Sequence, residues 1–367
     1  MMRELVIVEE AKDRVNKENA NIDKLPTELF NLILSNLFLD DWIRFRLTSK
    51  AWRSITPPIR PYSLVKQYKS ESQSVPWLLS FLNNKGVCNL YHPLYSDTYT
   101  MNIPELAGTI VRDAKFGWLL MSRGETSIFF YNPLTMETIE LPGHENYYNF
   151  VNISFSSPPT SSDCIVFGHH LCAKMSVYLK KCETWFDYWI ETPLEFMASY
   201  CNPVFSDGVF YSLSRDGKLG VFDPSAEEGS EWKVLPVPPV VCFGGVTSNT
   251  STRSFIMGYD GEIFSVALGY MGKTVSVFKL DCSRMEWHRL ESLDDKVAFL
   301  SHTSSMLVPA RLKGVENRIY LPKFQGKESL FYSMKTGKYH CFGSKDSQVD
   351  WTNTSEHWNC TWIDSIL

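Results

Sequence analysis

The chain has 367 residues, which suggests about two domains by the usual size of a protein domain. Hydrophobic residues make up 44% and charged residues 21%, so the chain is globular and a mainly disordered protein is excluded. The net charge of -5 argues against a protein that grips nucleic acid, for which a basic face is expected.

Residues 1–20 are rich in Glu, Lys, Asn and Asp, and we expect them to form a disordered tail. Their one apolar run, residues 5–8, is shorter than the core of about 7 to 15 residues in a signal peptide. No run in the chain approaches the roughly 20 apolar residues that span a bilayer. We therefore expect a protein of the cytoplasm or nucleus, or of both, with no membrane partner.

The next segment, residues 21–60, has the pattern of a small helical domain. Leu25, Leu29, Ile33 and Leu37 recur every fourth residue and form one apolar stripe on a helix. Two aspartates interrupt the stripe, and Ser49 is a suitable N-cap for a last helical turn. Three short helices bury little apolar surface by themselves, so the exposed stripe indicates a partner protein.

This segment resembles the F-box. The family binds the Skp-type adaptor of a cullin-based ubiquitin ligase, and whatever follows the F-box selects the substrate. The resemblance implies partners of three kinds: the adaptor, the cullin and RING subunits reached through it, and a protein substrate that the sequence does not identify. The adaptor-binding residues that it implies are Leu25, Pro26, Leu29, Ile33, Leu37, Asp40, Ile43, Leu47, Ser49, Lys50, Trp52 and Arg53.

Prolines 57, 58 and 61 end the helical domain, and residues 61–76 are expected to form a linker with a helical passage. From Trp77 onward the sequence consists of short apolar and aromatic runs separated by Gly, Pro, Asn and Asp, which is typical of an all-β domain. The runs that we expect to be strands include residues 116–120, 205–213 and 261–266. The β domain is assigned to residues 77–350, and residues 351–367 are expected to close it.

A loose repeat can be followed through the turns of this domain. Each repeated turn follows an apolar run and precedes another, at a spacing of about 40 to 58 residues that matches four strands per unit. The turns lie at residues 91–93, 131–133, 180–182, 222–224, 280–282 and 332–334. We predict a mainly β protein with a small N-terminal α domain: a three-helix F-box followed by a six-bladed β-propeller. One or two β-sandwiches are the alternative.

The arrangement as a whole resembles a large group of plant F-box proteins with a KIB-like C-terminal domain, also called a domain of unknown function. The supporting residues are the run 117–120, the turn at 131–134 with the strand and proline at 139–142, and the late run 317–320. The resemblance implies a propeller that binds the substrate.

The sequence suggests no chemistry of its own. The nine cysteines show no CxxC pair, so we expect reduced thiols and not a disulfide framework. Cys164, His169, His170 and Cys172 are zinc-ligand types in a short stretch, but adjacent histidines on a strand point to opposite faces. We find none of the phosphate-loop, hydrolase, metalloprotease or dinucleotide motifs. We predict no metal, no cofactor and no catalytic residue.

These inferences predict the substrate-recognition subunit of an SCF-type ubiquitin ligase. The alternatives are a propeller hydrolase or lyase with accessory helices, and an F-box adaptor that serves no ligase. An enzyme is expected to show converging Asp, Glu or His side chains at the channel mouth, and a receptor an aromatic or charged surface patch. Tyr147-Tyr148 is a candidate for such a patch, whereas we expect the aromatic run 185–189 to pack inside or between blades.

Overall fold

The computed structural model describes residue 29 and residues 75–364, apart from 83–84, 94–96, 125–126, 134, 144–149, 172, 191–194, 241–252, 312, 327, 342–348 and 357–358. The chain divides into a unit of residues 1–73 with residue 367 and a unit of residues 74–366. The second unit is the β domain. No helix among the described residues is long and apolar enough to cross a membrane. The predicted tail, the F-box helices and the passage at 62–73 lie outside the described residues, except for Leu29.

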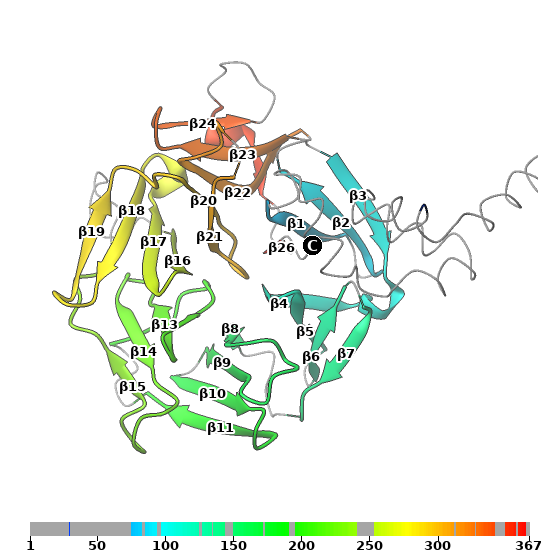
Figure 1. Cartoon of the computed structure of the whole chain (residues 1–367), viewed down its shortest axis with the longest axis vertical. Helices are drawn as coiled ribbons and strands as arrows, with labels where there is room; N and C mark the ends of the chain where they lie inside the picture. The colour runs from blue at the N-terminus through cyan, green and yellow to red at the C-terminus, as the bar shows by residue number, and fades with distance from the viewer. Residues whose placement is uncertain are drawn as a thin grey trace, which may run out of the picture. The chain divides into compact units, whose positions relative to one another are not determined.

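Six sheets surround a central axis in the second unit, so the propeller and its six blades are confirmed (Figure 1). Blades 1 to 3 contain β26 (Cys360–Ile363), β1 (Trp77–Leu82), β2 (Val87–His92), β3 (Asp97–Asn102); β4 (Thr109–Lys115), β5 (Trp118–Arg123), β6 (Ser127–Asn132), β7 (Glu137–Glu140); β8 (Phe150–Phe155), β9 (Ile165–His170), β10 (Lys174–Leu179) and β11 (Thr184–Trp189). Each is given from its innermost to its outermost strand.

Blades 4 and 5 have the same order, and blade 6 departs from it. They contain β12 (Val204–Ser206), β13 (Val209–Leu213), β14 (Leu219–Phe222), β15 (Trp232–Val234); β16 (Arg253–Tyr259), β17 (Glu262–Leu268), β18 (Val275–Asp281), β19 (Glu286–Leu290); and β21 (Met306–Pro309), β20 (Lys296–Phe299), β22 (Arg318–Gln325), β23 (Glu328–Ser333), β24 (Lys338–Cys341). In blade 6, β20 pairs with β22 in parallel, and β25 (Ser355–Glu356) adds to β22. Three 3-10 turns, η2 (Pro104–Leu106), η4 (Tyr270–Gly272) and η5 (Trp351–Asn353), lie in the connections.

The repeated turns that the sequence shows are structurally equivalent. Each joins the last two strands of its blade, from β2–β3 in blade 1 to β23–β24 in blade 6. The residue before the outermost strand has a positive φ in four of them, at Met136, Glu183, Met285 and Gly337. The repeat in the sequence therefore follows a repeated hairpin geometry.

Three strand predictions are corrected at their turns. Residues 205–213 form a hairpin of β12 and β13 and not one strand, because Asp207 and Gly208 both have positive φ, as a tight two-residue turn requires. The same turn occurs at Phe116-Gly117 and Asp260-Gly261, so the strands there begin after the glycine. Each turn joins the first two strands of a blade.

The ring closes through two strands that lie far apart in the sequence. The C-terminal β26 is the innermost strand of blade 1, where it pairs antiparallel with β1 from Trp77↔Ile363 to Ser80↔Cys360. The side chain of Trp362 is fully buried, stacks edge-on against Phe299 at 4.9 Å and donates from Nε1 to the Leu300 carbonyl at 2.9 Å. Phe299 and Leu300 belong to blade 6, so this tryptophan holds blades 1 and 6 together.

Replacing Trp362 by alanine should lower the free energy of unfolding by about 3 to 5 kcal/mol, as is usual for a buried aromatic residue. Urea denaturation followed by fluorescence measures this loss. Trp189→Ala is the matched control, since Trp189 is exposed and its removal should cost less than about 0.5 kcal/mol. Equal losses in the two variants would contradict the role of Trp362 in ring closure.

Candidate functional site

The adaptor-binding residues of the sequence prediction remain untested by the structure. Leu29 is helical and 49% exposed. The others lie outside the described residues: Leu25, Pro26, Ile33, Leu37, Asp40, Ile43, Leu47, Ser49, Lys50, Trp52 and Arg53. The pair Tyr147-Tyr148 also lies outside them.

Polar groups from several blades meet at the propeller axis around Asn202, which precedes β12. Its Nδ2 donates to the carbonyls of Arg112 and Thr303, each at 2.6 Å, and its Oδ1 accepts from the amide of Ile153 at 3.1 Å. Its own amide donates to the His302 carbonyl at 3.1 Å. One side chain thus joins blades 2 and 3 to the loop between β20 and β21 of blade 6. The sequence analysis missed this residue, because its partners are almost all backbone groups on distant strands.

A partly buried ion pair lies on β4, the innermost strand of blade 2. The Asp113 carboxyl on β4 is fully buried, and its Oδ2 lies 3.2 Å from the Lys115 Nζ. Burial raises the pKa of Asp113, and the nearby Lys115 ammonium opposes this rise. Lys115 also donates to the Ser154 hydroxyl at 2.5 Å, which links blade 2 to blade 3. Among the described residues, Asp113 is the only carboxylic acid that is fully buried, so they provide no pair of buried carboxylates for hydrolysis.

The two histidines of the suspected zinc cluster lie on opposite faces of β9, as the alternation of a strand predicts. The His169 Nε2 is 2.9 Å from the Ser212 hydroxyl of blade 4, whereas His170 stacks on Phe150 at 4.0 Å and contacts the Ser176 hydroxyl at 2.7 Å. Cys164 donates from its thiol to a backbone carbonyl, and Cys172 lies outside the described residues. No group of three potential metal ligands occurs in the part of the chain that the structure describes.

The aromatic run on β11 divides between the core and the surface, in part against the prediction. Trp185 and Tyr188 pack against the hydrophobic clusters between blades, as expected. Trp189 is 68% exposed and Phe186 is also exposed. Trp185 and Trp189 share one face of the strand and Phe186 and Tyr188 share the other, so each face is part buried and part exposed, which the aromatic composition of the run does not reveal.

The exposed Trp189, at the end of β11, lies at one face of the propeller. We call this the top face, where the innermost strands of blades 1 to 5 begin. At this face the exposed side chains of Leu171, Met197 and Tyr200 lie on the loops of blades 3 and 4. Arg215 lies over the Tyr200 ring at 5.0 Å and its amide donates to the Met197 carbonyl at 2.8 Å. The blade 3/4 patch, defined as Leu171, Trp189, Met197, Tyr200 and Arg215, thus combines apolar, aromatic and cationic side chains.

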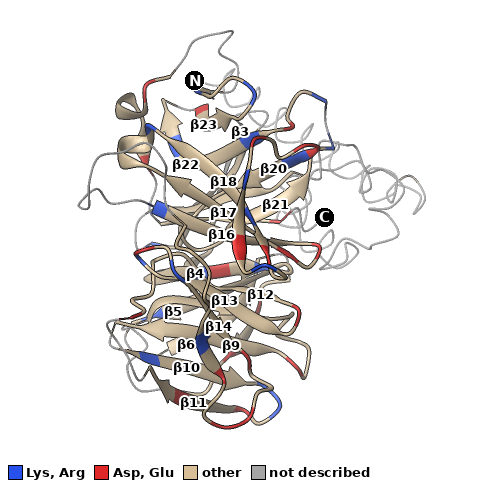
Figure 2. Cartoon of the chain, turned by 90° about the vertical axis from the view of Figure 1, so that its left-hand side faces the viewer, with Lys and Arg blue, Asp and Glu red and all other residues tan. Residues whose placement is uncertain are grey.

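Charges elsewhere on the propeller are mixed in sign. In the side view of Figure 2, Lys and Arg alternate with Asp and Glu along the strands and loops. Several of them form pairs, such as Lys279 with Glu262 at 2.5 Å and Lys174 with Asp187 at 2.8 Å. The side of the propeller seen in Figure 2 therefore carries no large patch of charges of a single sign.

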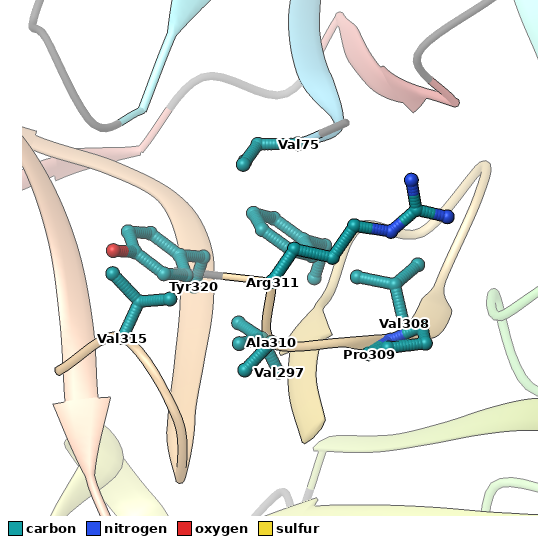
Figure 3. Close-up of a pocket in the computed structure, with 9 residues that line it drawn as sticks. Val75, Val297, Val308, Pro309, Ala310, Arg311, Val315 and Tyr320 are labelled. Carbon is teal, nitrogen blue, oxygen red and sulfur yellow. The ribbon is translucent and has the colours of Figure 1, made fainter. Parts of the chain in front are cut away.

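A shallow apolar pocket lies beside the seam between blades 1 and 6. Figure 3 shows Val75, which precedes β1, facing Tyr320 and several valines, with the Arg311 guanidinium at one side. Val75, Val297, Phe299 and Tyr320 belong to the same hydrophobic cluster as Trp362. The pocket is thus an edge of the packing that closes the ring.

The comparisons with known proteins agree with this architecture. Residues 88–345 match the model of the KIB1-4 beta-propeller, and residues 22–58 match that of the F-box domain. The chain belongs to the KIB1-4 β-propeller family. The sequence prediction of a plant F-box protein with a KIB-like propeller is therefore confirmed.

Several F-box proteins match this KIB1-4 propeller chain along most of their length. The F-box/kelch-repeat protein At1g57790 of Arabidopsis thaliana is 32% identical over 345 residues, which are 92% of this chain and 93% of that protein. The F-box protein At3g56470 of the same plant is 28% identical over 87% of this chain and 84% of its own length. The F-box protein KIB4, also of that plant, is 23% identical over 86% of both chains.

The fully buried His169 of this KIB-type propeller makes its stability depend on pH. Burial, together with the neighbouring His170, lowers the pKa of His169 to about 3. The unfolded chain takes up this proton near pH 6.5 and the folded chain only near pH 3, so the free energy of unfolding falls as the pH is lowered through this window. Above pH 6.5, His169 is neutral in both the folded and the unfolded chain, and its protonation no longer lowers the free energy of unfolding.

The variant His169→Gln has no group that titrates at this position, and its side-chain amide takes the place of the imidazole near Ser212. Between pH 6 and pH 4, the unfolding free energy of the parent chain should fall more steeply than that of the variant, by up to about 1.4 kcal/mol per pH unit. Urea denaturation at each pH measures both slopes. Parallel slopes would show that His169 titrates normally in the folded protein.

Proposed function

We propose that this chain is the substrate-recognition subunit of an SCF-type ubiquitin ligase, with no catalytic role of its own. The observation that supports this most is the F-box match at residues 22–58 in the same chain as a complete six-bladed propeller. The F-box binds a Skp-type adaptor and, through it, the cullin and RING subunits. The propeller binds the target protein.

Tethering provides the mechanism. A target held on the propeller has its lysines confined near the ubiquitin-charged enzyme, and such confinement can supply an effective concentration in the millimolar range. The rigid connections at the axis, from Asn202 to three blades, support this role because they fix the blades relative to one another. The chain acts in the cytoplasm or nucleus, without nucleic acid or membrane as a partner.

The blade 3/4 patch is the surface that we assign to the target. Interface energy is concentrated in a few aromatic and arginine side chains, and Trp189, Tyr200 and Arg215 supply these types at one face. Arg215 is held by its contact with the Tyr200 ring, so part of the ordering cost of binding is met before the target arrives. A propeller hydrolase or lyase would instead require converging acids at the channel mouth.

Changing Leu25 and Pro26 together to alanine should weaken binding to a purified Skp-type adaptor by about tenfold or more, because both residues begin the apolar stripe of the F-box. Surface plasmon resonance measures the affinity, and far-ultraviolet circular dichroism checks that the propeller remains folded. Unchanged affinity in a folded variant would count against the adaptor role and favour a chain that works outside a ligase.

Changing Trp189 and Tyr200 together to alanine should remove target proteins from affinity purifications while the adaptor and cullin stay bound. Lys180→Ala and Lys181→Ala, made together in the turn between β10 and β11, are the matched control at the opposite end of blade 3. Quantitative mass spectrometry of the three baits measures the outcome. An unchanged set of targets with the patch variant would place the substrate surface elsewhere.

A further inference from the structure

A buried group of charges lies beside the channel mouth on the top face, away from the blade 3/4 patch. The Glu356 carboxylate on β25 accepts from the Arg253 Nη1 with both oxygens, at 2.7 and 2.8 Å. Arg253 is the first residue of β16 in blade 5, and Glu356 is paired across the ladder with Lys323 on β22 of blade 6. One carboxylate therefore stands between two cations that come from neighbouring blades.

Lys323 makes no hydrogen bond to the Glu356 carboxylate. Its Nζ lies 4.0 Å from the nearer Glu356 oxygen, which is beyond hydrogen-bond distance, and 4.4 Å from the centre of the Trp351 ring. The side chain is only 6% exposed, and it has no hydrogen bond to any of the described residues. An ammonium group carries three donors, and burying a charge without acceptors is costly.

The charges around Lys323 act on its pKa in opposite directions. Burial lowers the pKa of Lys323; Glu356 opposes this effect and Arg253 adds to it. His302, in the loop between β20 and β21, is near enough to Arg253 and Glu356 to feel both charges, and burial lowers its pKa as well. Glu356 is thus a carboxylate that both Arg253 and Lys323 face.

We propose that Lys323, with Arg253 beside it, forms a binding site for one oxyanion, a carboxylate or a phosphate group. The anion accepts hydrogen bonds from the Lys323 ammonium, which the described protein atoms leave without an acceptor. The Arg253 side chain is 37% exposed, which places one side of the charge group in contact with solvent. Anion binding here is independent of the ligase role.

Thermal denaturation of the full-length chain tests this site with sodium phosphate, against sodium chloride at equal ionic strength. Phosphate should raise Tm by about 2 °C or more at ten times its Kd and should saturate, whereas chloride should not. Isothermal titration calorimetry should give one phosphate per chain. A Tm that is the same in phosphate and chloride, with no heat of binding, would overturn the proposal.

Two variants move the affinity in opposite directions. Lys323→Met keeps the length of the side chain next to Trp351 but removes the donor, so the phosphate response should be lost. Glu356→Gln removes the competing negative charge and should tighten phosphate binding several-fold. Lys335→Met, an exposed lysine in the turn between β23 and β24 of the same blade, is the control and should respond as the parent chain does. A phosphate response that survives in Lys323→Met, or no change of affinity in Glu356→Gln, would show that the anion binds elsewhere.

The same calorimetry distinguishes two sources of the anion. Malonate and inorganic phosphate represent small free anions, and a phosphoserine tripeptide represents a group carried on a polypeptide. Binding of the small anions alone assigns the site to a soluble ligand. Equal binding of the tripeptide assigns it to an acidic group of a partner protein.

Discussion

Ring closure is the constraint on which the rest of this propeller depends. β1 and β26 come from opposite ends of the β domain, and their pairing gives blade 1 its innermost strand. Trp362 then packs this strand against blade 6, and Tyr91 of blade 1 accepts a hydrogen bond from the Ser329 amide of blade 6 at 3.0 Å. Without these contacts the two blades would present open sheet edges, which proteins generally avoid. The positions of the other blades around the axis follow from this closure.

The top face carries the two features to which we assign binding. The innermost strands of blades 1 to 5 begin there, and so do the loops that carry the blade 3/4 patch and the charge group around Glu356. These loops differ in length and composition from blade to blade, whereas the hairpin turns inside the blades repeat. A rigid frame with variable loops on one face is suited to binding, because the loops can change without disturbing the sheets. The same arrangement explains why family membership does not identify the substrate.

The outer parts of the fold were predictable and the inner parts were not. The turns between the last two strands of each blade are local, and their geometry favours the same residues each time, as the positive φ at Met136, Met285 and Gly337 illustrates. The innermost strands β8 and β26 are buried at almost every position, so no alternation marks them. The parallel pairing of β20 with β22 and the contribution of β26 to blade 1 depend on contacts between distant segments, which no local pattern contains. For the site, the F-box motif indicated a partner class, whereas the roles of Asn202, Trp189 and Lys323 depend on neighbours from other blades.

The distance along the chain between β1 and β26 also has a consequence for biosynthesis. β1 is among the first parts of the propeller to leave the ribosome, yet its inner partner follows only after all the other blades have been made. Until then the inner edge of β1 has no strand to pair with, and an unpaired edge is a template for association with other chains. A message that stops before codon 360 would yield a chain that retains residues 22–58 but has an open ring. Such a product keeps an unpaired inner edge on β1 and is prone to aggregation.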